Sequence, residues 1–109
     1  MSKSSTTMRR ARKPDLIHNP PPGEILLEDF MKPLGLSQNA LARALRVSPR
    51  RINELVNSKR SISADSDLRL ARYFGVSEGI FLGLQADFDL MEQKRKLGDR
   101  LDEISPHAA

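Results

Sequence analysis

Residues 37–60, SQNALARALRVSPRRINELVNSKR, contain two short helical patterns joined by only three residues, Arg46-Val47-Ser48. Ser37 stands where it can cap the first helix, and Ser48 stands where it can cap the second. Pro49 then fills the first helical position, for which its fixed φ is suited. A connection this short does not allow antiparallel packing, so the two helices must cross steeply.

The second of these helices leaves a polar and basic face outside. Ala42 permits a close crossing, Val47 fills the turn and Ile52 anchors the second helix from below. This arrangement is that of a helix-turn-helix, whose second helix enters the major groove of DNA. Arginine can donate two hydrogen bonds to guanine and asparagine can pair with adenine, whereas amides and lysines near helix ends bind phosphates. The predicted DNA-binding residues are Gln38, Ser48, Pro49, Arg50, Arg51, Asn53, Asn57, Lys59 and Arg60.

Helical signals continue on both sides of this motif. The sequence predicts helices over residues 24–31, 38–45, 49–57 and 64–74, and a fifth helix that begins at Ser77. Helix stops fall where proline or glycine interrupts the pattern, at Pro33, Gly35 and Gly75. No Asn-Gly or Asp-Gly pair separates alternating apolar runs, so no strand is predicted. The expected fold is an all-α, five-helix, repressor-like helix-turn-helix domain.

Apolar residues at helical spacing define one expected core. The side chains predicted to point inward are Ile25, Leu26, Phe30, Leu41, Ala42, Ala44, Leu45, Ile52, Leu55, Val56, Leu68, Leu70, Ala71, Phe74, Phe81, Leu84, Phe88 and Met91. A second stripe on the fifth segment exceeds what one small core needs: Leu90, Leu97, Leu101 and Ile104. One recognition helix contacts too few base pairs for selectivity, so we expect a homodimer through the fifth segment, with recognition helices about 34 Å apart.

Charge divides the chain into three parts. Residues 1–13 carry five basic side chains and no acid, and we expect residues 1–19 to be a flexible basic arm. Residues 36–60 carry six basic side chains against one acid, which suits a nucleic-acid backbone. Residues 78–103 carry seven acids and four bases. We expect the helix-turn-helix domain to span residues 20–92, followed by a helical extension or tail over residues 93–109.

Several function classes are disfavoured. The chain has no cysteine, and its two histidines lie near opposite ends, so neither a metal site nor a cofactor site is predicted. No run of apolar residues approaches the ~20 needed to cross a bilayer, and no export signal is evident, which favours the cytoplasm. Acidic pairs such as Asp65 and Asp67 are two residues apart and diverge on a helix. No catalytic motif is present, so an enzyme is not expected.

Longer segments around the motif resemble a known family. These segments are PPGEILLEDFMKPLGLSQNALARAL, VSPRRINELVNSKRSISADSDLRLARYFGVS and FLGLQADFDL, within residues 19–101. They resemble the Cro/repressor-like (XRE) helix-turn-helix superfamily and, within it, the HigA-type antitoxins of bacterial toxin–antitoxin modules. The resemblance implies a dimer that binds a palindromic operator of double-stranded DNA in its own promoter. It also implies tight binding to a small RelE-like ribonuclease toxin, which is thereby silenced.

Three positions depart from the family pattern. The turn usually carries glycine where this chain has Arg46, and a left-handed backbone there would cost a non-glycine residue about 1 kcal/mol. Ser58 stands where another glycine is usual. A tryptophan common near Phe81 is missing, and Phe81 should fill that core position.

Other functions remain open at this point. The chain could be a stand-alone, prophage-type repressor without a toxin, or an adaptor whose motif no longer binds DNA, although the basic second helix speaks against the adaptor. If a toxin partner exists, it needs a basic surface to hold RNA, so its inhibitor should offer acids. The candidate acidic surfaces are Glu24, Glu28 and Asp29 on the first helix and the segment 87–103 at the C-terminal end.

Overall fold

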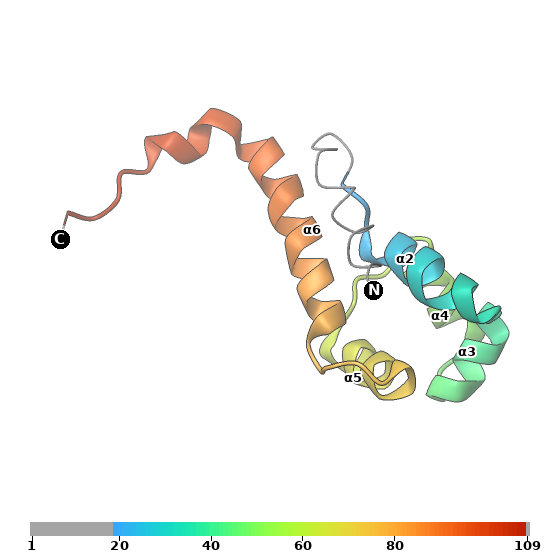
Figure 1. Ribbon diagram of the computed structural model, residues 1–109. Helices are drawn as coiled ribbons and strands as arrows, with labels where there is room; N and C mark the ends of the chain where they lie inside the picture. Colours follow the sequence, from blue (N-terminus) through green and yellow to red (C-terminus); the bar gives the residue numbers. More distant parts are fainter. Residues whose placement is uncertain (1–18, 109) are drawn as a thin grey trace.

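The computed structural model describes residues 19–108, which over that range form helices and turns without a strand. This confirms the predicted all-α fold (Figure 1). The predicted arm, except for Asn19, lies outside the described residues, as does His18. The elements are α2 (Pro22–Ile25), η1 (Leu26–Met31), η2 (Lys32–Leu34), α3 (Gln38–Leu45), α4 (Pro49–Val56), α5 (Ala64–Phe74), α6 (Ile80–Leu97) and η3 (Gly98–Glu103).

The first predicted helix is assembled from three helical turns of different pitch. It begins earlier than expected, at Pro22, which occupies the first helical position where its missing N–H costs nothing. The segment then widens into the π-helical turn η1 and ends in the 3₁₀ turn η2, which contains Pro33. Gly35, in the left-handed region at φ 61°, stops it as predicted.

The three middle helices begin at the predicted caps. The side-chain oxygens of Ser37, Ser48 and Ser63 accept hydrogen bonds from the backbone N–H groups three residues later, at 3.0, 3.1 and 3.2 Å. Each bond satisfies one of the N–H groups that a helix start leaves without an intrahelical partner. Helices α3 and α5 have the predicted bounds, and α4 ends one residue early. Local sequence therefore sets these boundaries.

The turn between α3 and α4 contains a non-glycine residue in the left-handed conformation, at one of the positions that depart from the family pattern. Arg46 is left-handed at φ 63° and ψ 43°, and its N–H bonds back to the end of α3. Ser58, after α4, is also left-handed at φ 61°. Both positions would be easier for glycine, so each side chain costs about 1 kcal/mol of strain. The core packing of Val47 nevertheless holds the turn in place.

The core joins η1, α3, α4, α5 and the start of α6. Its fully buried members include Leu26 from η1, Leu41 from α3, Ile52 from α4, Leu70 from α5 and Phe81 from α6. Phe81 is 0% exposed and lies 4.9 Å, ring centre to ring centre, from Phe30. Phe81 therefore fills a core position, as predicted.

Helix α6 starts three residues later than predicted, at Ile80 rather than Ser77. Gly79 precedes it in a left-handed conformation and makes no side-chain cap. The cap comes instead from Asp67 of α5, whose carboxylate is 1% exposed. It accepts N–H bonds from Gly79 at 2.7 Å, Phe81 at 2.8 Å and Leu82 at 3.0 Å.

The first turns of α6 pack on the body, and its C-terminal part forms an arm with η3 (Figure 1). Asn19 ties the base of the arm to the start of the domain, donating to the Phe88 carbonyl at 3.1 Å and to Glu92 at 3.0 Å. Leu90, Leu101 and Ile104 are 60, 45 and 70% exposed. Helix α6 passes continuously through residue 93, and the predicted division of the chain there stays a prediction.

Three residues predicted to point inward do not. Ala44 is exposed, Leu68 is 48% exposed and Met91 is 37% exposed. Ala44 and Leu68 both line an open hollow between α3 and α5, and Met91 lies on the arm formed by α6. Within residues 19–108, no helix is both long and apolar enough to cross a membrane.

Candidate nucleic-acid interface

Helix α4 presents its first turn to solvent. Ser48 caps the helix, Pro49 opens it, and both are exposed. The side chain of Arg50 is 86% exposed, even though it is paired with Glu54 one turn later. Ile52, Leu55 and Val56 are buried on the opposite face. The amphipathic pattern of this helix therefore positions Arg50 for an external ligand.

Two predicted DNA-binding residues from different helices meet at the surface. The Asn53 amide of α4 donates a 3.1 Å hydrogen bond to the side-chain oxygen of Gln38, the first residue of α3. This bond fixes one end of each amide and leaves the Gln38 NH₂ group as a donor at a helix start. Free N–H groups at that start add to the attraction for an anion.

Glu54 organises the basic residues on the far side of α4. Its carboxylate accepts hydrogen bonds from Arg60 at 2.8 and 3.0 Å and from Arg50 at 3.0 Å. The guanidinium groups of Arg60 and Arg50 lower the pKa of this carboxyl below its ordinary value. Glu54 is therefore ionised near neutral pH. Its negative charge is paired with Arg50 and Arg60 and orients both side chains, so Glu54 does not act on a nearby phosphate as an unpaired carboxylate.

The remaining predicted residues follow α4 in the loop. Asn57 ends the helix, and its N–H bonds to the Asn53 carbonyl at 3.0 Å. Lys59 is exposed, and its N–H bonds to the Glu54 carbonyl at 2.8 Å. The left-handed Ser58 lets the chain fold back here, so Lys59 and Arg60 lie beside the end of α4.

Arg51 behaves differently from its neighbour Arg50. Its side chain is only 23% exposed and is paired with Asp65 and with the Ser66 hydroxyl, at 2.9 Å, on α5. Asp65 also accepts from Arg69 Nε at 2.9 Å. Asp65, Ser66 and Arg69 were not among the predicted site residues, because partners 14 and 15 residues away across a loop leave no periodic signal.

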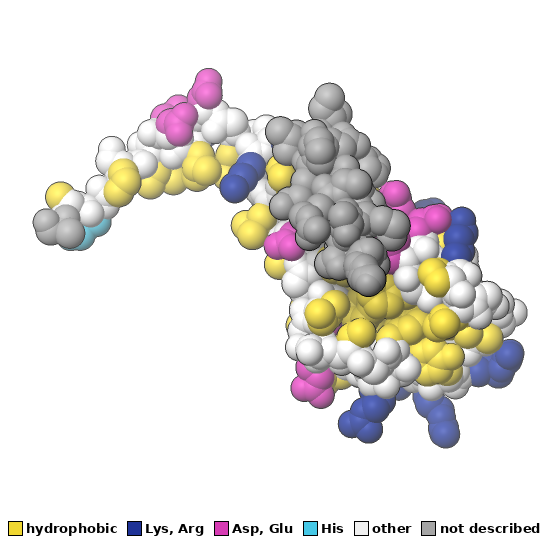
Figure 2. All heavy atoms as spheres, in the orientation of Figure 1, with side chains coloured by type: hydrophobic (Ala, Val, Ile, Leu, Met, Phe, Trp, Pro, Cys, Tyr) yellow, Lys and Arg dark blue, Asp and Glu magenta, His cyan; other side chains and the backbone are white. Residues whose placement is uncertain are grey.

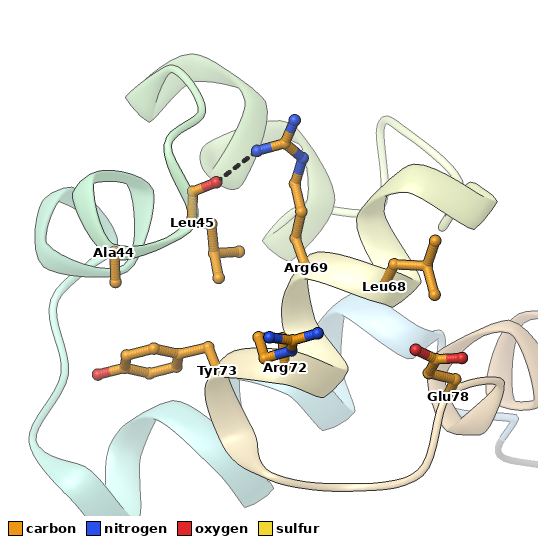
Figure 3. Close-up of a pocket in the computed structure, with 7 residues that line it drawn as sticks. All are labelled: Ala44, Leu45, Leu68, Arg69, Arg72, Tyr73 and Glu78. Carbon is orange, nitrogen blue, oxygen red and sulfur yellow. Dashed lines mark hydrogen bonds between the residues drawn. The ribbon is translucent and has the colours of Figure 1, made fainter.

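Arg69 connects this cluster to the end of α3. Its terminal nitrogen donates a 2.7 Å hydrogen bond to the Leu45 carbonyl, at the rim of the hollow of about 590 Å³ between α3 and α5 (Figure 3). The lining residues of the hollow are Ala44, Leu45, Leu68, Arg69, Arg72, Tyr73 and Glu78. The last carbonyls of a helix have no intrahelical partner, so Arg69 supplies the Leu45 carbonyl with a donor from another helix.

Known proteins share the motif and the helices around it. The helix-turn-helix family model matches residues 27–81, from η1 through the first turn of α6. Virulence-associated protein I of Dichelobacter nodosus is 56% identical over 69 residues, which cover 63% of this chain and 64% of that protein. The chain thus spans just under two thirds of the length of that relative.

Two solved structures match more of the chain. Pseudomonas aeruginosa antitoxin HigA with the higBA promoter has a TM-score of 0.77 and 38% identity, covering 84% of this chain and 100% of that one. An addiction module antidote protein of the HigA family from Coxiella burnetii has a TM-score of 0.77 and 34% identity, covering 83% and 99%. The predicted resemblance to HigA-type antitoxins is confirmed.

Proposed function

Because this chain belongs to the helix-turn-helix family, we propose that it is a HigA-type antitoxin that binds operator DNA through α4 and represses its own operon. The observation that carries this proposal is the placement of exposed Arg50 and Asn53 on α4, with Asn53 bonded to the half-buried Gln38 at the start of α3. The P. aeruginosa HigA structure, which contains its own promoter, supports the same use of the fold.

Within this site we assign two roles. Arg50 and Asn53 contact base edges in the major groove, because both lie on the exposed face of α4 near its start. Phosphates on either side of these base contacts are bound by Gln38, Asn57, Lys59 and Arg60. The helix start formed by Ser48 and Pro49 approaches the DNA backbone. Arg51 belongs to the predicted set, but its partners on α5 hold its side chain.

We expect Arg50→Ala to weaken operator binding by roughly 10- to 100-fold for each half-site, because a bidentate arginine–guanine contact is worth about 1–3 kcal/mol. Glu54 keeps Arg60 as its partner in this variant, so the fold should be unaffected. The measurement is fluorescence anisotropy with a duplex from the promoter of this gene and with a scrambled duplex of the same length.

The matched control is Lys59→Ala, which removes the same charge from the loop after α4. It should weaken both duplexes equally and make the salt dependence shallower by about one unit. If Arg50→Ala also lowers the two affinities equally, Arg50 contacts only phosphate, and the assignment of base contact is wrong.

We further propose that the antitoxin neutralises a RelE-like ribonuclease through its acidic surfaces. Acidic side chains gather on the outer side of the arm, away from α4, and basic ones lie along the lower edge of the body (Figure 2). On the first helix Glu28 is half-exposed and paired with Lys32 at 2.8 Å. A toxin held on these surfaces leaves Arg50 free, so the complex could still repress.

We expect charge reversal at Glu24, Glu28 and Asp29 combined with deletion of residues 98–109 to abolish co-purification with the product of the neighbouring gene. The deletion spares α6 and the bond from Asn19 to Glu92. Reversal of Asp29 alone serves as the graded control. Full retention of the toxin by the combined variant would refute a role for the first helix and for residues 98–109, and a neighbouring gene that encodes no toxin would favour the stand-alone repressor.

A dimer is the expected state, with the arm as its interface. Its exposed leucines give a solvent-facing apolar surface that a second copy could cover (Figure 2). We expect Leu101→Lys to convert the dimer to a monomer in light scattering at tens of micromolar. Leu68→Lys is the matched control, since Leu68 is 48% exposed and Leu101 is 45% exposed. Loss of the dimer in the control alone would move the interface to the hollow on α5.

A further inference from the structure

Two adjacent arginines at the start of the recognition helix are held in opposite ways. Arg50 is paired within α4 with Glu54, and its side chain is 86% exposed. Arg51 is paired with α5, and its side chain is 23% exposed. The chain therefore keeps one of two neighbouring positive charges available at the DNA-facing end of α4 and withdraws the other.

The group that withdraws Arg51 is anchored on both sides. Asp65 accepts hydrogen bonds from Arg51 and from Arg69. The two guanidinium groups lower the pKa of the carboxyl, and Arg51 has the larger effect. Asp65 therefore remains charged at neutral pH. Ser66, the second partner of Arg51, is 3% exposed and its N–H is bonded to Ser63 at 3.2 Å. Arg51 thus docks on a fixed helix start rather than on a mobile side chain.

The same carboxylate links α5 to both helices of the motif. Through Arg51 it contacts the first turn of α4, and through Arg69 it is connected to the Leu45 carbonyl at the end of α3 (Figure 3). Asp65 itself lies in the first turn of α5. One exposed acidic residue on α5 is therefore connected to both α4 and the end of α3.

We propose that Asp65 is a specificity-determining positioning residue, which holds Arg51 away from the DNA backbone so that Arg50 and Asn53 decide which sequences bind. This inference rests on the proposed DNA-binding function. A long cation freed at the start of α4 would attract any phosphate, which raises affinity for all sequences without adding sequence information. Specificity is the difference between the two affinities, so it falls when nonspecific binding rises.

The test is Asp65→Asn, which removes the charge with little change in shape. Asp87→Asn, at an exposed position on α6, is the control because it changes the net charge by the same amount on an element outside the candidate DNA interface. The probes are a duplex selected by the wild-type chain from a random library and a scrambled duplex of the same length. Anisotropy titrations over a range of salt give both affinities and their salt slopes.

We expect Asp65→Asn to raise affinity for the scrambled duplex several-fold and to steepen its salt slope by about one unit per chain. The ratio of selected to scrambled affinity should fall by a factor of about ten, while Asp87→Asn leaves that ratio unchanged. Adding Arg51→Met to Asp65→Asn should return the slope to the wild-type value. A residue that only supported the fold would lower both affinities together and would leave the slope unchanged.

Two results would overturn the proposal. An increased ratio in Asp65→Asn would mean that Arg51 contacts bases and that Asp65 competes with DNA for it. Unchanged affinities and slopes would mean that the ion pair has no role in DNA binding. Failure of the proposed function itself is seen separately, because the wild-type chain would then select no duplex from the library.

Discussion

Replacing Gly23 with alanine is expected to destabilise the domain by about 3 kcal/mol or more, the upper part of the range for overpacking. A Cβ atom on Gly23 would lie 2.8 Å from the Val56 carbonyl oxygen and closer still to that of Leu55. Both oxygens belong to the backbone at the end of α4, so neither can rotate away. Relief requires α2 to move off the recognition helix.

The measurement is urea denaturation followed by circular dichroism, and Gly83→Ala is the control. Gly83 lies inside α6, and a Cβ atom there would meet nothing within 4 Å. Alanine at this position should therefore stabilise by about 0.5–1 kcal/mol through helix propensity. The same substitution should thus have opposite signs at the two positions. Equal effects would show that α2 and α4 do not approach each other this closely.

Asp67→Ala should cost about 3–5 kcal/mol, since it leaves a group of N–H donors without their charged acceptor. The carboxylate is buried and accepts from Gly79, Phe81 and Leu82 at the start of α6. Its negative charge also lies at the positive end of that helix. Without it, the first turn of α6 should fray and release Phe81 from the core.

A graded series separates the charge from the hydrogen bonds. Asp67→Asn can keep the oxygen that accepts from Phe81 and Leu82, but it turns an NH₂ group toward the Gly79 N–H, so its loss should be intermediate. Asp87→Ala, on the exposed side of α6, should change the free energy of unfolding by less than about 0.5 kcal/mol. A similar loss in Asp67→Ala and Asp87→Ala would mean that the cap contributes nothing.

Local signals account for most of what could be predicted. Ser37, Ser48 and Ser63 mark helix starts because a short side-chain oxygen reaches the N–H three residues on. Gly35 and Gly75 mark helix ends because the left-handed region costs glycine nothing. Such contacts span a few residues, and their geometry is the same in any fold.

The prediction of the DNA interface also rests on local sequence patterns. Arg50 and Asn53 lie on the exposed face of α4 because its buried stripe is periodic, and the sequence alone shows that stripe. The same periodicity could not decide between Arg50 and Arg51, since both lie outside the stripe. Their different exposures depend on which element packs beside each one.

By itself, then, the sequence determined the five helical segments, the serine caps of the three middle ones and the exposed face of the second helix of the motif. Only the tertiary structure decided that Arg51 docks on Asp65, that Asp67 caps α6 and that Gly23 admits the end of α4. These contacts join residues 12 to 33 positions apart. Hydrogen bonds, charge pairing and close packing act through space at a few ångströms, and chain separation leaves no periodic trace of them.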